Sequence, residues 1–343
     1  MLRGRLKAGE GGRRRFSTGP VPRDQTSETV REIKATRSRT VEKVATSERP
    51  SVAGVGISHP DRLIYSDLGI SKIQLARYFA DVGSQMLPHV VGRPLTLLHC
   101  PDGLAGPCNF LRHAKAWGPS ALRRVRIREK TKVGEYLIAD SVEALVSLAQ
   151  MGIVEIHTWN STDDDVERPN RIVLDLDPGP AVTWRQVVTA ARLVRDCLKT
   201  LGLASWVKTT GGHGLHVVAP IVPERDWSEC LAFARDVSEA IARTDPDLYT
   251  TRFAKAGRED KLLVDYLRNN RTNTSVSAWS PRARPGAQVS MPLTWGELAK
   301  GPEPWTLFTV PRRLKRSKTD PWAGYWHTRQ RVTATMMKAL RRL

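Results

Sequence analysis

Residues 171–180, "RIVLDLDPGP", combine an apolar strand pattern with two closely spaced acids. Because successive side chains of a strand point to opposite faces, Asp175 and Asp177 emerge on the same face. Neighbouring anions repel each other unless a cation joins them, and carboxylate oxygens favour Mg²⁺ or Mn²⁺. The segment predicts a strand that ends at Pro178 and carries part of a metal site. A solvated strand edge and the DxD motif of manganese-dependent sugar transferases remain alternatives.

A third acid follows another apolar run. Asp265 stands in "KLLVDYLRNN", residues 261–270, and Arg268 comes three residues later. Three carboxylates on neighbouring strands can hold two ions that bind the attacking and leaving oxygens of an in-line displacement. This pattern indicates nucleotidyl transfer. The alternative is that Asp265 serves only as a cap or as an ion-pair partner.

The segment "KTTGGHGLHVVAP", residues 208–220, has glycines that let the backbone approach a triphosphate closely. Thr210 offers a hydroxyl, and His216 begins a strand where its imidazole can reach a phosphate or a sugar. The GxxxxGK[ST] pattern of a P-loop is absent, and a glycine-rich hairpin turn is the alternative. His157 and Arg282 are further candidates for this site, although a lone strand histidine is more often structural.

The overall charge narrows the class of partner. The chain has 343 residues, 40% of them hydrophobic, and a formal net charge of +19. A core can therefore be buried, and the excess of positive charge favours a polyanion, with nucleic acid as the first candidate. No apolar run approaches the roughly 18 residues of a membrane-spanning helix, so we expect no membrane partner.

The four cysteines indicate a reducing compartment. They are Cys100, Cys108, Cys197 and Cys230, with no CxxC pair and no signal-peptide pattern nearby. We expect buried thiols in a cytoplasmic, nucleoid-associated protein. His99 and His113 flank the first two cysteines, but the spacing matches no zinc template, so zinc is not expected.

Composition divides the chain into three parts. We expect a disordered basic tail at 1–50, a catalytic domain at 51–310 and a basic aromatic-containing segment at 311–343. The tail has 13 Lys or Arg against 6 Asp or Glu in its first 49 residues. It can act as a basic arm on nucleic acid, and a solvated leader or an early start codon is the alternative.

The C-terminal segment carries 10 Lys or Arg against one Asp. We expect it to pack on the catalytic domain through its aromatic residues. The alternative is contact with nucleic acid, because Trp322, Tyr325 and Trp326 interleave rings with charge in the way that suits base stacking.

Hydrophobic periodicity predicts a mixture of helices and strands without internal repeats. Helices are expected over residues 71–91, 142–152, 183–203 and 227–246, and strands over 93–100, 135–140, 154–159, 171–178, 205–221 and 261–269, with a glycine hinge inside 205–221. The fold class is therefore α/β or α+β.

Taken together, these segments resemble a known family. From about Ser58 to Trp305, "HPDRLIYSDLGISK", "VVGRPLTLLHCPDGLAGPCNFLRHA", "VEIHTWNS", "RIVLDLDPGP", "KTTGGHGLHVVAPI" and "VDYLRNNRTNTSVSAWSPRARPGAQVSMPLTWGEL" follow in the order of the polymerase domain of bacterial ligase D. That domain belongs to the archaeo-eukaryotic primase superfamily. The resemblance implies an α+β (mixed α/β) primase-like catalytic core with an RNA-recognition-like sheet that bears the metal-binding acids.

The resemblance also implies a role for each candidate residue. The catalytic metal ligands would be Asp175, Asp177 and Asp265, holding two ions of Mn²⁺ or Mg²⁺. The incoming nucleotide would contact His157, Thr210, His213, His216, Arg268 and Arg282. The DNA 5′-phosphate and the template would contact Arg62, Lys72 and Phe110.

Three positions depart from the pattern of the family. Asn109 precedes Phe110 where the family commonly has two phenylalanines, so one stacking ring is missing. Thr210 and His213 stand where it commonly has serine and lysine. Since an imidazole is only partly charged near neutral pH, His213 replaces a permanent cation at the triphosphate.

The function that the resemblance implies is a template-directed nucleotidyltransferase. It would be a bacterial DNA repair polymerase that favours ribonucleotides from an NTP/dNTP pool and fills short gaps or breaks with a downstream 5′-phosphate, as in base excision repair. We expect a stand-alone monomer similar to the Prim-PolC branch, with a separate DNA ligase as partner and no ligase or nuclease module in this sequence. The alternatives are a polymerase for non-homologous end joining at double-strand breaks and a non-catalytic DNA-binding recruitment protein.

Overall fold

The fold of this chain is described by a computed structural model. The described residues are 49–115, 118–254, 256–301, 304–316 and 319–340. The tail predicted for residues 1–50 lies outside them except for its last two residues. Among the described helices, none has both the length and the apolar character that a membrane crossing requires.

A six-stranded sheet carries the acids, in the strand order β13-β14-β10-β12-β11-β16. Its central part follows the chain order β10 (Arg171–Pro178), α4 (Trp184–Thr200), β11 (Trp206–Thr209), β12 (Leu215–Pro220), α5 (Trp227–Thr244) and β14 (Leu262–Asp265). The four strands of this βαββαβ unit pair antiparallel. The order confirms the predicted α+β fold with an RNA-recognition-like sheet.

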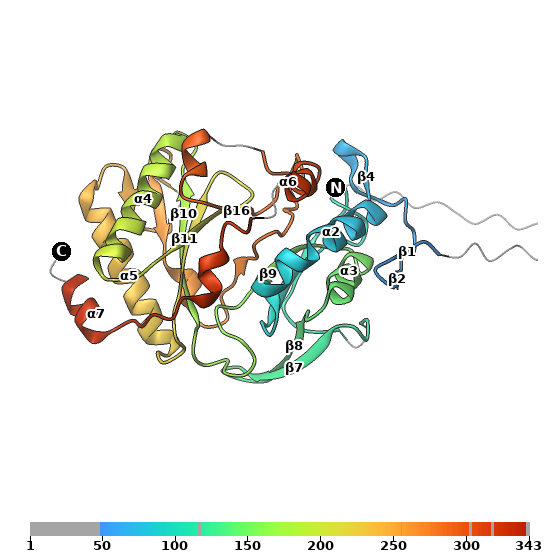
Figure 1. Ribbon diagram of the computed structural model, residues 1–343, viewed down its shortest axis with the longest axis horizontal. Coiled ribbons are helices and arrows are strands. Elements are labelled where there is room, and N and C mark those ends of the chain that lie inside the picture. The colour runs from blue at the N-terminus through green and yellow to red at the C-terminus, as the bar shows by residue number, and fades with distance from the viewer. Residues whose placement is uncertain (1–48, 116–117, 255, 302–303, 317–318, 341–343) are drawn as a thin grey trace, which may run out of the picture. The chain divides into compact units, whose positions relative to one another are not determined.

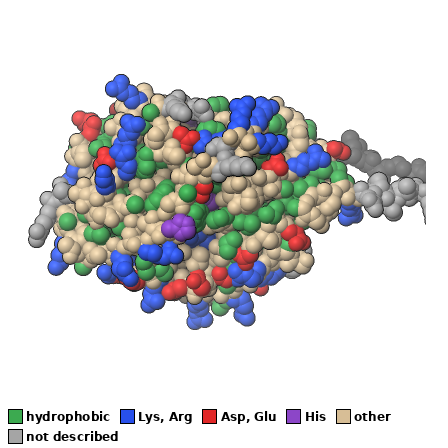
Figure 2. Space-filling view, in the orientation of Figure 1, with side chains coloured by type: hydrophobic (Ala, Val, Ile, Leu, Met, Phe, Trp, Pro, Cys, Tyr) green, Lys and Arg blue, Asp and Glu red, His purple; other side chains and the backbone are tan. Residues whose placement is uncertain are grey.

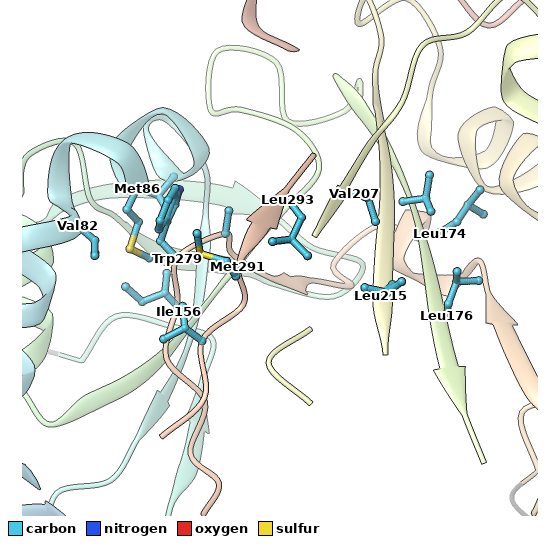
Figure 3. Close-up of a cluster of buried hydrophobic side chains, with 14 of the residues drawn as sticks. Val82, Met86, Ile156, Leu174, Leu176, Val207, Leu215, Trp279, Met291 and Leu293 are labelled. Carbon is cyan, nitrogen blue, oxygen red and sulfur yellow. The ribbon is translucent and has the colours of Figure 1, made fainter. Parts of the chain in front are cut away.

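The two faces of this sheet differ because its strands alternate. Leu174 and Leu176 of β10 point to the face that α4 and α5 cover, and both are fully buried. Figure 3 shows that this apolar layer continues through Leu293 to Met86, so one core joins both parts of the fold. Asp175 alternates with these leucines and is held on the opposite face.

A second, four-stranded sheet has the order β15-β9-β5-β6. Its strands are β5 (Leu95–His99), β6 (Asn109–Leu111), β9 (Ile153–Thr158) and β15 (Ser275–Val276), with α2 (Lys72–Val90) and α3 (Val142–Gln150) beside them (Figure 1). Helix α2 begins after Ser71, as predicted, and the amide of Ser71 donates to Gln74 Oε1 at 2.7 Å.

Shorter elements complete the described fold. They are β1 (Ser51–Val52), β2 (Val55–Gly56), β3 (Leu63–Tyr65), β4 (Ile70–Ser71), β7 (Arg123–Arg128), β8 (Val133–Ile138), β13 (Tyr249–Thr250), β16 (Pro292–Leu293), α6 (Thr309–Arg316), α7 (Ala334–Leu340) and the 3₁₀ helices η1 (Ser66–Leu68), η2 (Leu267–Asn269), η3 (Glu297–Lys300) and η4 (Ala323–His327). Each predicted helix and strand is present, but the strand expected over 261–269 ends at Asp265, and η2 follows it.

The aromatic residues of the C-terminal segment pack on the acid-bearing face of the six-stranded sheet. Trp322 is 1% exposed, touches Val173 and Val218, and donates from its indole nitrogen to the carbonyl of Val207 at 3.0 Å. Tyr325 is buried in the same cluster. Since neither ring is free to stack on a base, the structure favours packing over the nucleic-acid alternative for these two residues.

One expectation about the cysteines is wrong. Cys100 and Cys108 form a disulfide instead of remaining thiols, while Cys197 and Cys230 are free. The cause is the pairing of β5 with β6, which sets His99 opposite Asn109 and brings the two adjoining Cα atoms to 4.4 Å. Two cysteines eight residues apart, without a CxxC motif, do not by themselves predict the hairpin of β5 and β6 that brings them together.

Candidate active site

The candidate site is a row of side chains across four strands of the six-stranded sheet. In the strand register, Asp265 of β14 lies opposite Asp175 of β10, which lies opposite His216 of β12, which lies opposite Lys208 of β11. Residues directly opposite on neighbouring strands share a face. Two acids and two basic residues thus form one line.

Arg268 joins the two acids of this row. Its Nε lies 3.0 Å from Asp175 Oδ2 and 3.4 Å from Asp265 Oδ2. Burial and the charge of Asp175 raise the pKa of Asp265 to about 6, although Arg268 opposes the shift. Burial also acts on Asp175, but His216 and Arg268 outweigh it and hold the pKa of that carboxyl well below its usual range. The row therefore holds one ionised acid and one that is easily protonated.

His216 stands beside Asp175 with one ring nitrogen unused. Its Nε2 lies 3.3 Å from Asp175 Oδ1, while the buried Nδ1 has no hydrogen-bond partner among the described residues. Burial and the charge of Lys208 lower the pKa of His216 to about 4. The imidazole is therefore neutral, and its Nε2–H can donate to the Asp175 carboxylate.

Asp177 lies beside the row, two residues after Asp175 on β10. Its side chain is 57% exposed, and its Oδ2 is 3.2 Å from Arg258 Nη2. Pro178 ends β10 directly after it, as predicted.

The three carboxylates fit a divalent metal by donor type, and Asp175 and Asp265 also fit by spacing. Arg268 reaches Asp175 and Asp265 at once, so one cation can contact both oxygens. Carboxylate oxygens are the hard donors that Mg²⁺ and Mn²⁺ prefer. In the described part of the chain no three His, Cys, Asp or Glu side chains stand together as a metal cluster, and arginines pair with Asp175 and Asp177. Asp175, Asp177 and Asp265 are the residues that would hold the ions.

A cavity of about 290 Å³ opens over this row. It is lined by His157, Asp175, Asp177, Thr210, His213, His216, Arg268 and Arg282, together with Pro178, Gly214, Ser275, Val276 and Arg284. All six residues predicted to contact the nucleotide thus line the same cavity as Asp175 and Asp177. The third predicted metal ligand, Asp265, does not line it but pairs with Arg268.

The glycine hairpin between β11 and β12 forms one wall of this cavity. Gly211 has φ +67°, which a residue with a Cβ adopts only with strain. At Gly214 a Cβ would collide with the carbonyl oxygen of Leu176. The hairpin is therefore built to lie close against β10, where its backbone can approach a phosphate chain.

The second sheet supplies the opposite wall. His157 projects from β9, and the ring of Phe110 from β6 stands edge to face with it, 5.5 Å between centroids. Phe110 is 59% exposed, which is unusual for a phenylalanine and suits a surface that stacks on a base. Phe110 thus lies beside the nucleotide cavity.

Arg62 and Lys72 form a separate basic site. The amide of Lys72 donates to the carbonyl of Arg62 at 2.8 Å, and Arg62 Nη1 donates to Pro101 O at 2.6 Å. Burial and the charge of Arg62 lower the pKa of Lys72 to about 8. Lys72 is also the first residue of α2, where the helix dipole favours an anion.

Three charged residues of this region were not predicted. Side chains two residues apart in a strand point to the same face. Glu155 and Lys208 could therefore have been predicted from their distance of two residues to a candidate site residue. Glu155 precedes His157 by two residues on β9, and Lys208 lies two residues before Thr210. Arg258 lies in a loop and meets Asp177 only through the tertiary fold, so no local pattern indicates it.

Comparison with known proteins shows the family of this chain. The family model described as LigD, primase-polymerase domain, matches residues 71–322. The multifunctional non-homologous end joining protein LigD of Pseudomonas aeruginosa is 38% identical over 301 residues, 87% of this chain and 36% of that protein. The protein of the same name from Mycolicibacterium smegmatis is 32% identical over 247 residues, 71% of this chain and 32% of that protein. The chain thus spans about a third of the length of these curated relatives.

A solved structure agrees as well. The polymerase domain from Mycobacterium tuberculosis Ligase D in complex with DNA matches with a TM-score of 0.73 and 29% identity, over 77% of this chain and 95% of that chain. That structure is similar to this chain over nearly its whole length.

Acids in register on an RNA-recognition-like sheet, beneath a basic cavity, define a DNA-directed nucleotidyltransferase of the primase-polymerase class. More particularly, the chain belongs to the LigD primase-polymerase domain family.

Proposed function

We propose that this chain extends primer 3′ ends at short gaps or breaks in DNA that carry a downstream 5′-phosphate, and that it adds ribonucleotides in preference to deoxyribonucleotides. The observation that carries the proposal is the cavity where Asp175 and Asp177 meet His216, Arg268 and Arg282. It sets anionic metal ligands directly beside cationic groups, as a metal-bound triphosphate requires.

In this proposal the triphosphate of the nucleotide lies along the glycine hairpin. Arg268 and Arg282 neutralise charge that builds up on the phosphates, and the Nε2–H of His216 donates to the Asp175 carboxylate and so orients it. When bound at Asp175, Asp177 and Asp265, two divalent ions, Mn²⁺ in preference to Mg²⁺, supply Lewis-acid activation of the primer hydroxyl and charge neutralisation.

The gap edge binds at the separate basic site. Two adjacent cations, Arg62 and Lys72, would hold the 5′-phosphate by charge-assisted contacts at the start of α2. Phe110 would stack on the template strand beside His157. Lys and Arg side chains are spread over the face seen in Figure 2, which supports contact with a long polyanion.

The proposal is tested by extension of a labelled primer on a short-gapped duplex with Mn²⁺. We expect faster extension with rNTPs than with dNTPs and stimulation by a 5′-phosphate over a 5′-hydroxyl. The Asp175→Ala change should reduce extension on the order of 1000-fold or more while leaving DNA affinity within twofold. Asp196→Ala, on the exposed face of α4, is the matched control. Full extension by Asp175→Ala would refute the site.

Two alternatives have distinct outcomes in the same assay. Preference for two ends with short complementary overhangs over a gap would favour end joining at double-strand breaks. Tight DNA binding without extension would favour a recruitment protein.

In the proposed role the chain acts as a monomer at the nucleoid and hands its product to a separate DNA ligase.

A further inference from the structure

Glu155 is a buried acid at the edge of the cavity that the proposed chemistry leaves unused. It lies on β9 and is 4% exposed. A carboxylate removed from water to that extent is stable only when other groups compensate its charge. Its partners therefore show what it does.

Two of the three partners of Glu155 are candidate nucleotide contacts. Its Oε2 lies 2.8 Å from His157 Nε2 and 3.1 Å from Arg282 Nε, and its Oε1 accepts a hydrogen bond from the amide of Ala283 at 2.8 Å. Burial alone would raise the pKa of Glu155, but His157 and Arg282 outweigh it and lower that pKa to about 2. The side chain is therefore an anion that accepts charge-assisted hydrogen bonds from His157 and the amide of Ala283 and forms an ion pair with Arg282.

Arg282 extends this arrangement to the other sheet. Its Nη1 donates to the carbonyl of Thr210 in the glycine hairpin, and its own carbonyl accepts from the hydroxyl of Tyr65 at 2.8 Å. A Cβ at Gly211 would collide with Arg282 Cγ, so the hairpin packs directly on this side chain. A continuous chain of contacts thus runs from β9 through Arg282 to the hairpin.

We propose that Glu155 is a positioning residue that holds His157 and Arg282 side by side at the cavity in one arrangement, so that a nucleoside triphosphate meets a preformed site. This inference rests on the proposed function, because it assumes that the cavity binds a nucleotide. Without Glu155 the His157 imidazole can rotate. The Arg282 guanidinium loses the only carboxylate that pairs with it among the described residues. The nucleotide would then have to order both side chains on binding.

The first test is a comparison of nucleotide affinity. ATP is titrated with Mn²⁺ present and DNA absent into the unaltered chain and into the Glu155→Gln and Glu224→Gln variants. Glu155→Gln keeps the shape but removes the charge, and we expect it to weaken ATP binding by about 10- to 100-fold, the effect of losing hydrogen bonds to a charged group. Glu224→Gln is the control, because Glu224 also pairs with an arginine but is 50% exposed and lies outside the cavity. Equal ATP affinity in the Glu155 variant and the unaltered chain would overturn the proposal.

A double-mutant cycle separates positioning from a general structural role. If Glu155 acts through Arg282, the Glu155→Gln change should have less than a threefold effect once Arg282→Ala is present. The same comparison is made with His157→Ala. In steady-state extension, KM for ATP should rise while the affinity for gapped DNA stays within twofold. Full additivity in both cycles would overturn the inference.

A second variant tests the inference if the Glu155→Gln variant does not fold. Glu155→Asp keeps the charge that balances Arg282 and His157, but it shortens the side chain by one methylene and cannot keep all three contacts. We expect a loss of ATP affinity of at least about fivefold, within the range of a weakened charged contact. Wild-type affinity in this variant would overturn the inference. Absence of primer extension by the unaltered chain would overturn the proposed function alone, because the binding comparison does not require extension.

Discussion

Asp175 and Asp265 face each other in register across β10 and β14, and Arg268 lies within 3.4 Å of both carboxylates. The pair shares one cation, so the two acids cannot both be ionised at low cost. A buried carboxylate beside another anion gains a raised pKa, and here Asp265 is the one affected.

Stability should depend on pH through Asp265. Its pKa is about 6 in the folded chain, against an ordinary value of 3.8. A raised pKa means that its contribution to stability is complete below about pH 4 and is lost as the pH rises through 6. Asp265→Asn should therefore stabilise the metal-free chain by about 1–3 kcal/mol at pH 8 and have little effect at pH 4. Urea unfolding in EDTA at both pH values measures this. The same difference at both values would contradict the pKa, and Asp196→Asn is the exposed control.

Recognition of the gap edge should depend on Lys72. In the Lys72→Ala variant, the dependence of log affinity on log salt for a gap with a 5′-phosphate should fall by about one unit of slope, because one phosphate contact is lost. Affinity for the same gap with a 5′-hydroxyl should change little. The measurement is a salt series of fluorescence anisotropy, with Lys199→Ala on α4 as control. An equal loss for both gaps would mean that Lys72 does not read the phosphate.

The hairpin histidine should limit the affinity for the triphosphate. His213 lines the cavity, and a lysine in its place would supply a permanent positive charge. His213→Lys should bind ATP about tenfold more tightly than the unaltered chain at pH 8. Titration calorimetry at several ATP concentrations is the measurement. Identical affinities for the two forms throughout would show that this side chain does not contact the triphosphate.

The C-terminal segment should contribute to stability more than to DNA binding. Trp322 is 1% exposed and packs on Val173 and Val218, so Trp322→Ala should cost about 3–5 kcal/mol of unfolding free energy. Urea denaturation measures the loss, and DNA affinity is compared at a temperature where both forms are folded. A large drop in DNA affinity with unchanged stability would favour the stacking role.

Much of the fold was predictable because its signals are local. Ser71 caps the start of α2, Pro178 ends β10, and the alternation of apolar and acidic residues sets Asp175 on the face away from Leu174. Such features depend on neighbouring residues alone, and a strand period of two is sufficient to assign a face.

Contacts between residues that are distant in the sequence could not be predicted in this way. Nothing in the local pattern shows that Asp265 meets Asp175 or that Arg258 meets Asp177, since register between distant strands and the course of loops are set by tertiary packing. The role of Arg62 and Lys72 came from resemblance to a family, not from their spacing. The disulfide was missed because it depends on a hairpin between β5 and β6.

The βαββαβ order has a consequence for how this site comes into existence during folding. Asp175 lies on the first strand of the unit and Asp265 on the last, so 90 residues must be organised before the acids meet. Pairing of strands so far apart in sequence is slow, because a large loop must close before the contact contributes. Recovery of primer extension after dilution from denaturant would thus report the completion of the sheet, and it should lag behind the return of helical circular dichroism.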